Sequence, residues 1–426
     1  MANGAILSVP RTKFPELSED VFAVTSRPWI PPPLKPFDFL PDLMQKNEEN
    51  LKPRDDIKPL HVVQPEGVSF KLDGNELEWQ NWDMHISLTH HKGIALSTIT
   101  YNDNELQSTR ILGNLPLIQV NAVWEQWLMS YCWDVTVLVK FTTCAVVIKN
   151  TICIHEEDNG VLWKHTDYRP GGHTQTVRRI WLVVSMVCTL ANYEYIWNYH
   201  FYQGDSIELE VHLTGILQVY VAETNEPIKF GTKVVPNVNA QYHQHLFSSC
   251  VDPMIDCINN STIESNVVPL PNASTGSDLN FGGNAFIQED TVLKKEAGRD
   301  WDWEKEQKWK IVNLARQHYS SRKDVGYVVR VKGGVTLMMA RKDGWALKRA
   351  EFLNYPVWVC RDVEGAKGSR MWPAGKMPVE HLNITLKPQS FFTMNPSMDI
   401  PGTRDPKSVA AFSQEAAPSH GHAGCH

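Results

Sequence analysis

The sequence lacks the features that mark several large classes of protein. Its apolar runs, such as Ile180 to Val187, have the length of a strand and are too short to span a bilayer. The amino terminus shows no charged region followed by a sustained apolar run, so we expect no signal peptide. Lys and Arg total 41 against 48 Asp and Glu, and this net charge of −7 argues against nucleic-acid binding as a main role. We therefore expect an intracellular protein, cytoplasmic or peroxisomal, without a membrane or nucleic-acid partner.

Cysteine pairs at metal-binding spacing are also absent. The eight cysteines are scattered along the chain, and in an intracellular protein we interpret them as mostly reduced thiols.

What is present indicates an ordered, mainly β protein. The chain has 426 residues with 15 Trp and 21% charged residues, a composition typical of a large folded core. Residues 1–58 are rich in Pro and charge and are predicted to be a linker, or the remnant of an N-terminal region. Residues 59–402 are predicted to form one large domain of antiparallel strands, and residues 403–426 a disordered tail.

Alternation of apolar and polar residues places the strands. Within residues 207–213, apolar side chains alternate with Glu and His, so one face of this strand is buried and the other is wet. A polar connection is expected over residues 272–310. Strands are expected over residues 178–188, 196–203, 207–217, 345–355 and 378–392, with a strand pair over 327–339.

Two short motifs carry the candidate chemistry. Residues 189–195 read TLANYEY, and residues 236–247 read PNVNAQYHQHLF. Residues two apart on a strand share a face, about 7 Å apart, so His243 and His245 could hold one metal ion with Gln244 turned away. Taken alone, the first motif also fits an aromatic-rich strand end, and the second fits two ordinary histidines.

Together these segments resemble the copper amine oxidases. The resemblance implies that Tyr193 is oxidised by copper and oxygen to topaquinone, which takes a primary amine as a Schiff base. It implies that Asn192 orients the quinone ring and that His243 and His245 bind copper. Imidazole ligands with open positions suit Cu(II), whereas Zn(II) prefers a tetrahedral site. The implied fold is a large antiparallel β supersandwich, with the family's N-terminal α/β domains largely missing from this chain.

Two elements of the family pattern are missing. The third copper-binding histidine precedes a Met-Pro-Val-Glu-His element in the family. Here residues 369–376 (SRMWPAGK) run directly into 377–381 (MPVEH), which indicates an internal deletion near residues 376–377 and leaves His381 at a position that is not a ligand in the family. The family's catalytic base, the Asp of Phe-Asp-x-Gly-Glu, has no counterpart, so no base is assigned.

A shift of the reading frame would explain the missing base. Family resemblance is expected to stop between Gln107 and Ala145, and residues 109–145 are interpreted as out-of-frame translation, since a shifted frame can encode a string containing AFDPGE. Asp134 is the one acid in the later half of that stretch that could stand in as the base. Asp252 falls at a position of the family's peripheral cation site, but Met254 replaces a second acid, so that site is not assigned.

Three functions are compatible with these observations. The first is an oxidoreductase, a homodimeric primary-amine oxidase that uses copper, topaquinone and O2 and releases an aldehyde, ammonia and hydrogen peroxide. The second is a catalytically dead β-sandwich remnant that lacks the base and the third copper ligand. A zinc hydrolase built on His243 and His245 is the third, but it needs a nearby acid and leaves TLANYEY unexplained.

Overall fold

A computed structural model of the chain describes residues 55–59, 61–89, 93–103, 108–116, 131–138, 145–190, 192–223, 228–245, 247, 249, 251–332, 339, 341, 343, 354–359 and 381–389. The chain divides into two compact units. One comprises Met1–His61 and Leu217–Tyr242, and the other comprises Val62–Ile216 and His243–His426. The expected linker over 1–58 lies almost wholly outside the described residues, and the expected tail over 403–426 lies entirely outside them.

The smaller unit contains one antiparallel sheet of three strands among its described residues. Its order is β11-β13-β12, with β11 at Val219–Val221, β12 at Gly231–Val235 and β13 at Val238–Gln241. The β12–β13 turn is tight, and Asn237 has a positive φ of 62° there, a conformation that Asn adopts more readily than most residues.

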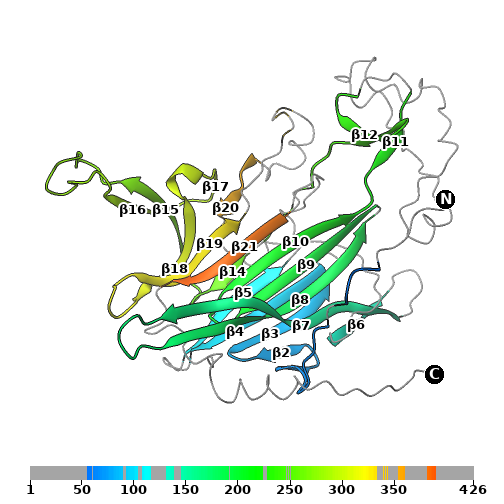
Figure 1. Cartoon of the computed structure of the whole chain (residues 1–426), viewed down its shortest axis with the longest axis horizontal. Helices are drawn as coiled ribbons and strands as arrows, with labels where there is room; N and C mark the ends of the chain where they lie inside the picture. The colour runs from blue at the N-terminus through cyan, green and yellow to red at the C-terminus, as the bar shows by residue number, and fades with distance from the viewer. Residues whose placement is uncertain are drawn as a thin grey trace. The chain divides into compact units, whose positions relative to one another are not determined.

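The larger unit is built on two antiparallel sheets (Figure 1). The first, as far as the described residues go, has the order β1-β2-β3-β4-β5-β14. Its strands are Phe70–Asp73 (β1), Glu76–Trp79 (β2), Trp82–Thr89 (β3), Gly93–Asp103 (β4), Ser108–Pro116 (β5) and Asp252–Met254 (β14).

The second sheet has the order β16-β15-β18-β19-β21-β10-β9-β8-β7-β6 over the described residues. Its strands are Tyr131–Leu138 (β6), Ala145–Thr166 (β7), Thr174–Leu190 (β8), Tyr193–Tyr202 (β9), Ile207–Gly215 (β10), Ser261–Pro269 (β15), Phe286–Val292 (β16), Lys308–Gln317 (β18), Asp324–Lys332 (β19) and His381–Gln389 (β21). A small two-stranded sheet pairs Ala297–Arg299 (β17) with Val357–Val359 (β20), and Trp303–Lys305 forms a single 3₁₀ turn (η2).

The core lies between the two large sheets and is rich in aromatic side chains. Alternate residues of β9, namely Tyr195, Trp197, Tyr199 and Phe201, are buried on its inner face. Trp82 of β3 meets the ring of Phe201 edge-on at a centroid distance of 5.2 Å, and its indole N–H donates to the carbonyl oxygen of Tyr202 at 2.8 Å. One side chain of the first sheet therefore makes both apolar and polar contacts with the second, which fixes the two layers against each other.

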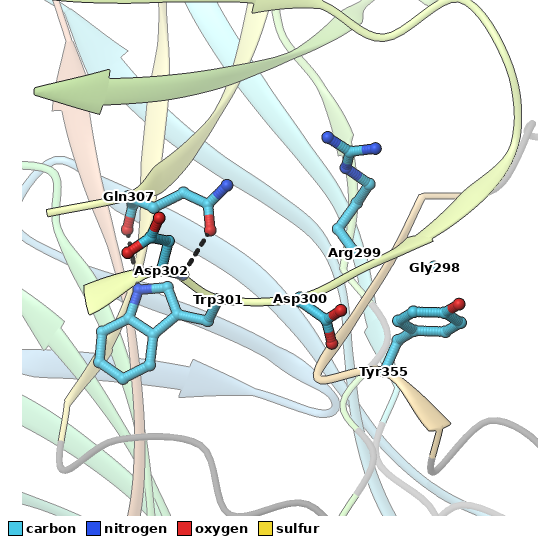
Figure 2. A pocket seen from close by; sticks show the side chains of 7 residues that line it. All are labelled: Gly298, Arg299, Asp300, Trp301, Asp302, Gln307 and Tyr355. Carbon is cyan, nitrogen blue, oxygen red and sulfur yellow. Dashed lines mark hydrogen bonds between the residues drawn. The ribbon is translucent and has the colours of Figure 1, made fainter. Parts of the chain in front are cut away.

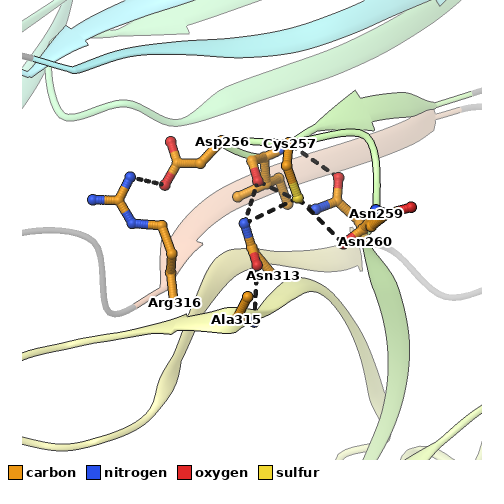
Figure 3. A network of polar contacts seen from close by, with 8 residues as sticks. Asp256, Cys257, Asn259, Asn260, Asn313, Ala315 and Arg316 are labelled. Carbon is orange, nitrogen blue, oxygen red and sulfur yellow. Dashed lines mark hydrogen bonds and ion pairs between the residues drawn. The ribbon is translucent and has the colours of Figure 1, made fainter.

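A buried amide ties β18 to the turn between β14 and β15 (Figure 3). Asn313 is 2% exposed, and its Nδ2 donates to the carbonyl oxygen of Ile255 at 2.9 Å and to the sulfur of Cys257 at 3.3 Å. Its Oδ1 accepts from the backbone N–H of Ala315 at 2.9 Å. Asn313 borders a register shift between β18 and β19, so its Oδ1 satisfies a backbone N–H that the interrupted ladder leaves, while its Nδ2 satisfies a carbonyl oxygen of the turn.

A carboxylate on β7 anchors the segment that leads into β1. Glu156 accepts hydrogen bonds from Gln64 Nε2 at 2.9 Å, from the backbone N–H of Ser69 at 2.7 Å and from Trp79 Nε1 at 2.8 Å. Burial opposes ionisation of Glu156, but these three donors outweigh it and lower the pKa of the carboxyl group. The charged form is therefore the one that the fold holds.

Glu156→Gln is expected to lower the free energy of unfolding at neutral pH by about 2 kcal/mol, because hydrogen bonds to a charged acceptor are stronger than those to an amide. Urea unfolding checks this value. Because the folded pKa is lowered, the contribution is fully present above the ordinary pKa of 4.5 and is lost as the pH falls through the folded value. Glu78→Gln is the matched control, since its carboxylate is exposed beside Lys71 and should contribute little. An equal effect of the two variants would refute the anchoring role of Glu156.

The expected fold class is confirmed, since the described chain is mainly β with antiparallel sheets and a sandwich core. The expected strand over 207–217 corresponds to β10, and the one over 378–392 corresponds to β21. The polar connection expected over 272–310 is wrong, because that stretch contains β16, β17, η2 and the start of β18. The strand pair expected over 327–339 is described only as far as Lys332, within β19, and most of the strand expected over 345–355 lies outside the described residues.

Candidate functional site

Tyr193 is the first residue of β9 and follows a tight turn from β8. Leu190 and Tyr193 are cross-strand partners in that hairpin. The hydroxyl of Thr189 donates to a carboxylate oxygen of Glu194 at 2.8 Å and closes the hairpin end. Tyr193 thus begins a regular strand whose other edge is covered by β10, where Gly215 lies opposite it.

Gly215 lets β10 approach the backbone of this turn closely. Its φ is +110°, and a Cβ added there would lie 2.4 Å from the carbonyl oxygen of Asn192 and 2.8 Å from the Cα of Tyr193. The next residue, Ile216, donates its N–H to that same Asn192 oxygen at 2.6 Å. A side chain at position 215 would displace the two residues of the motif that the sequence singles out.

Gly215→Ala is expected to lower the free energy of unfolding by about 1–3 kcal/mol, from steric overlap and an unfavourable φ. It should also shift the NMR signals of Tyr193, because the backbone at Asn192 has to move. Gly204→Ala, at the other end of the β9–β10 hairpin, is the control, since no atom lies within 4 Å of its added Cβ and its φ is not in the positive region. Equal stability of the two variants would contradict the close approach.

The two histidines lie in the segment directly after β13 rather than in a strand. β13 ends at Gln241, and residues 242–245 have no strand pairing, so the expected strand at His243 and His245 is wrong. The expectation that the histidines share a direction and that Gln244 points elsewhere agrees with the contacts. Gln244 is buried, and its Oε1 accepts from the backbone N–H of Met339 at 2.9 Å.

Each histidine meets a tyrosine of β9. The hydroxyl of Tyr193 is 2.5 Å from Nε2 of His243, and the hydroxyl of Tyr195 is 2.6 Å from Nδ1 of His245. The Tyr193 ring also lies against the His245 ring at a centroid distance of 4.7 Å, and the two imidazole centroids are 5.0 Å apart. Tyr193 and Tyr195 are two residues apart, and so are His243 and His245. Each tyrosine therefore faces one histidine.

The next alternate residue, Phe247, also contacts side chains of β9. Phe247 packs edge-on against Tyr195 at 5.9 Å and against Trp197 at 5.2 Å. Burial, with a smaller contribution from Tyr193, raises the pKa of Tyr195 to about 12, so its hydroxyl is protonated at neutral pH. The site is thus enclosed on the Tyr195 side, where His245 is only 4% exposed.

The site gathers nitrogen and oxygen donors of the kind that Cu(II) binds. Two imidazoles and the phenol of Tyr193 converge, and nitrogen and oxygen donors of this kind suit Cu(II). The described part of the chain holds no group of three or more His, Cys, Asp or Glu side chains that could bind a metal. His381 begins β21 opposite His212 of β10, and residues 360–380, which carry the expected deletion point, lie outside the described ranges.

For the other residues singled out from the sequence, the structure gives the position along the backbone. Asp134 falls at a register shift between β6 and β7, and Asp252 and Met254 lie on β14, which pairs with β5. Asn192 occupies the turn before Tyr193. Sequence reasoning assigned no role to Tyr195 or Gly215. The signal for Tyr195 was available, because residues 193 and 195 repeat the spacing of residues 243 and 245.

A separate hollow of about 390 Å³ lies at β17 and η2 (Figure 2). Two hydrogen bonds join its lining residues: Trp301 Nε1 donates to the carbonyl oxygen of Gln307 at 3.0 Å, and Gln307 Oε1 accepts from the backbone N–H of Asp302 at 2.7 Å. Arg299 pairs with the buried Glu264 at 2.6 Å. None of the site residues described above lines this hollow, and its paired groups indicate a structural role.

Comparison with known proteins identifies the family of this chain. The profile described as "Copper amine oxidase, enzyme domain" matches residues 71–122 and 129–376. The chain belongs to the copper amine oxidase family. It is 32% identical over 445 residues to "Copper amine oxidase 1" of Schizosaccharomyces pombe, covering 86% of this chain and 62% of that protein. It is 31% identical over 452 residues to the peroxisomal "Diamine oxidase [copper-containing] 1" of Nicotiana tabacum, covering 87% of this chain and 56% of that protein.

A solved structure agrees with the sequence relatives. The copper-containing benzylamine oxidase from Hansenula polymorpha superposes with a TM-score of 0.75 at 27% identity, over 86% of this chain and 66% of that one. The chain spans less than two thirds of the length of the two curated relatives named above.

The comparison also corrects one expectation from the sequence. The family match continues to residue 122 and resumes at residue 129, so the resemblance is not lost over the whole of residues 107–145.

In the described ranges, no helix is long and apolar enough to cross a membrane.

Proposed function

We propose that this chain oxidises primary amines to aldehydes, with release of ammonia and hydrogen peroxide, at the site formed by Tyr193, His243 and His245. The observation that carries the proposal is the 2.5 Å contact between the Tyr193 hydroxyl and His243 Nε2, beside the ring of His245. A phenol held against imidazole ligands is suited to oxidation by copper and O2 to a ring quinone. Membership of the copper amine oxidase family supports the same assignment.

The residues take the following roles. His243 and His245 would hold the copper ion, and Tyr193 is the precursor of topaquinone. Bound copper with O2 would supply the oxidation of the Tyr193 ring, and the quinone would then accept electrons from the amine. Asn192 steers the ring from the turn, where its carbonyl oxygen is fixed by Ile216. Gly215 keeps the backbone of that turn in place, because it leaves room for Tyr193 at the start of β9.

We place the protein inside the cell as a homodimer that acts on a primary amine and O2. Relatives that carry the word peroxisomal in their names include the tobacco diamine oxidase and the primary amine oxidase of Pichia angusta, which supports a peroxisomal or cytoplasmic location. Residues 59–402 would form the catalytic domain, residues 1–58 a remnant of the N-terminal region and residues 403–426 a tail.

A catalytically dead remnant is the second candidate. It is favoured by the absence of Phe-Asp-x-Gly-Glu and of the third copper-binding histidine from the sequence. Without a carboxylate to remove a proton from the carbon next to the amine nitrogen, turnover would be lost even if the cofactor formed.

One experiment separates the two candidates. The purified chain is loaded with Cu(II) in air, stained for redox-cycling quinone and treated with phenylhydrazine, while hydrogen peroxide release is followed with a primary amine. The oxidase should become coloured, and the peptide containing Tyr193 should gain two oxygen atoms and lose two hydrogens by mass spectrometry. Parallel samples with Zn(II), or with Cu(II) under argon, should stay colourless. If the copper-loaded protein stays colourless and releases no peroxide, the proposed oxidase activity is refuted and the chain is a catalytically dead remnant.

The reading frame has its own test. We propose that residues 109–145, which include the break in the family match between residues 122 and 129, contain out-of-frame translation, so that the base-bearing segment of the family is encoded but not expressed. Sequencing the coding nucleotides from Leu106 to Ile148 decides this. A frame encoding Ala-Phe-Asp-x-Gly-Glu is expected, and its absence in all frames would refute the proposal.

A further inference from the structure

We propose that Tyr195 is a positioning residue for His245. Its hydroxyl oxygen accepts the Nδ1–H of that imidazole and thereby directs the Nε2 lone pair to copper. The inference rests on the proposed function for the identity of the metal. The tautomer of His245 can be measured in the metal-free chain.

The geometry differs between the two tyrosine–histidine pairs. Tyr193 contacts His243 through Nε2, whereas Tyr195 contacts His245 through Nδ1 at 2.6 Å. Both members of the second pair are buried, with Tyr195 6% and His245 4% exposed. The phenol can donate to Nδ1 or accept from it, so this hydrogen bond couples the direction of the hydroxyl to the position of the proton on the His245 ring.

The chemistry of imidazole makes that choice consequential. A neutral imidazole carries one N–H and one lone pair, so a metal can bind through one nitrogen only when the proton sits on the other. Metal-binding histidines accordingly donate their second N–H to a nearby acceptor, which fixes the ring orientation. A hydroxyl is suited to this role because its oxygen accepts while its own proton points elsewhere, and a phenylalanine at position 195 could not accept at all.

Packing holds the pair in register. Tyr193, Tyr195 and Trp197 lie two residues apart on β9, and they meet His243, His245 and Phe247 in the same order. The rings of Tyr195 and Trp197 both press on Phe247. The segment from 243 to 247 therefore cannot slide along β9 without breaking all three contacts, which keeps the Tyr195 hydroxyl aimed at Nδ1.

The test uses Tyr195→Phe, which keeps the ring and removes the hydroxyl. Copper affinity is measured by competition titration, and the Cu(II) EPR spectrum reports nitrogen coordination. Loss of a hydrogen bond to a ligating histidine is expected to weaken copper binding about 10- to 100-fold. Tyr199→Phe is the control. Tyr199 is a buried tyrosine of the same strand, and its hydroxyl has no hydrogen-bond partner among the described residues, so its loss should leave copper affinity unchanged.

A metal-independent readout keeps the two proposals distinct. Long-range ¹H–¹⁵N NMR on the histidine-labelled, metal-free chain identifies the tautomer of His245, with His245→Gln used to assign its signal. The Nδ1–H tautomer is expected in the native chain, with loss of that preference in Tyr195→Phe. An Nε2–H tautomer in the native chain, or equal copper affinity of Tyr195→Phe and Tyr199→Phe, would overturn the role of Tyr195. The Nδ1–H tautomer in a chain that binds no copper would leave the assignment intact and overturn the proposed function instead.

Discussion

Tyr193→Phe is expected to abolish quinone formation completely. The substituted ring has no phenolic oxygen to be oxidised and loses the 2.5 Å contact with His243. Because Tyr193 is only partly buried and gives up one hydrogen bond, the free energy of unfolding should fall by about 1 kcal/mol or less. Redox-cycling stain, visible absorbance and phenylhydrazine reactivity after copper loading in air provide the measurement.

Tyr168→Phe is the control for that substitution. Tyr168 lies beyond the end of β7 and is 94% exposed, so its replacement should leave the colour as it is in the native chain. Colour that persists in Tyr193→Phe would show that another residue is oxidised and would remove Tyr193 from the proposed role.

Trp82→Ala is expected to have the largest effect on stability. The side chain is 1% exposed, lies 4.9 Å from the ring of Tyr101 and 5.2 Å from that of Phe201, and donates a hydrogen bond to Tyr202. Removing a buried tryptophan costs about 3–5 kcal/mol through lost transfer free energy and a residual cavity. That amount is a large part of the stability of an ordinary domain, so urea unfolding should show a strongly lowered midpoint.

Trp303→Ala is the control, since Trp303 of η2 is 71% exposed and should change the unfolding free energy by about 0.5 kcal/mol or less. Trp82→Phe should fall between the two, because it keeps an aromatic ring and loses the N–H donor. If Trp82→Ala and Trp303→Ala unfold at the same urea concentration, the proposed role of Trp82 in joining the sheets is wrong.

Alternation predicted the apolar face of β10, but the face expected to be wet is not wholly exposed, because Glu208 is 4% exposed and accepts a hydrogen bond from the Tyr202 hydroxyl at 2.7 Å. In β10, Ile207, Leu209 and Val211 are buried as the pattern predicts. Alternation did not reveal the strands within residues 272–310. β16 is exposed along nearly its whole length, and a strand with no buried face carries no apolar periodicity.

The candidate site was predictable in its residues and less so in its geometry. The TLANYEY and HQH segments indicated Tyr193, His243 and His245, and the structure brings those three side chains together. The expectation of a strand at the histidines was wrong, because a two-residue spacing fits any extended segment and not only a paired one.

The sequence by itself determined the residue types, their two-residue spacings and the family to which they belong. These are local properties, because they depend only on the order of residues within short segments. Only the tertiary structure decided that Tyr195 meets His245 through Nδ1, that Phe247 locks the register, and that Gly215 makes room at Asn192. Each of these contacts joins segments more than 20 residues apart, so it depends on how the side chains of the core fill space against one another.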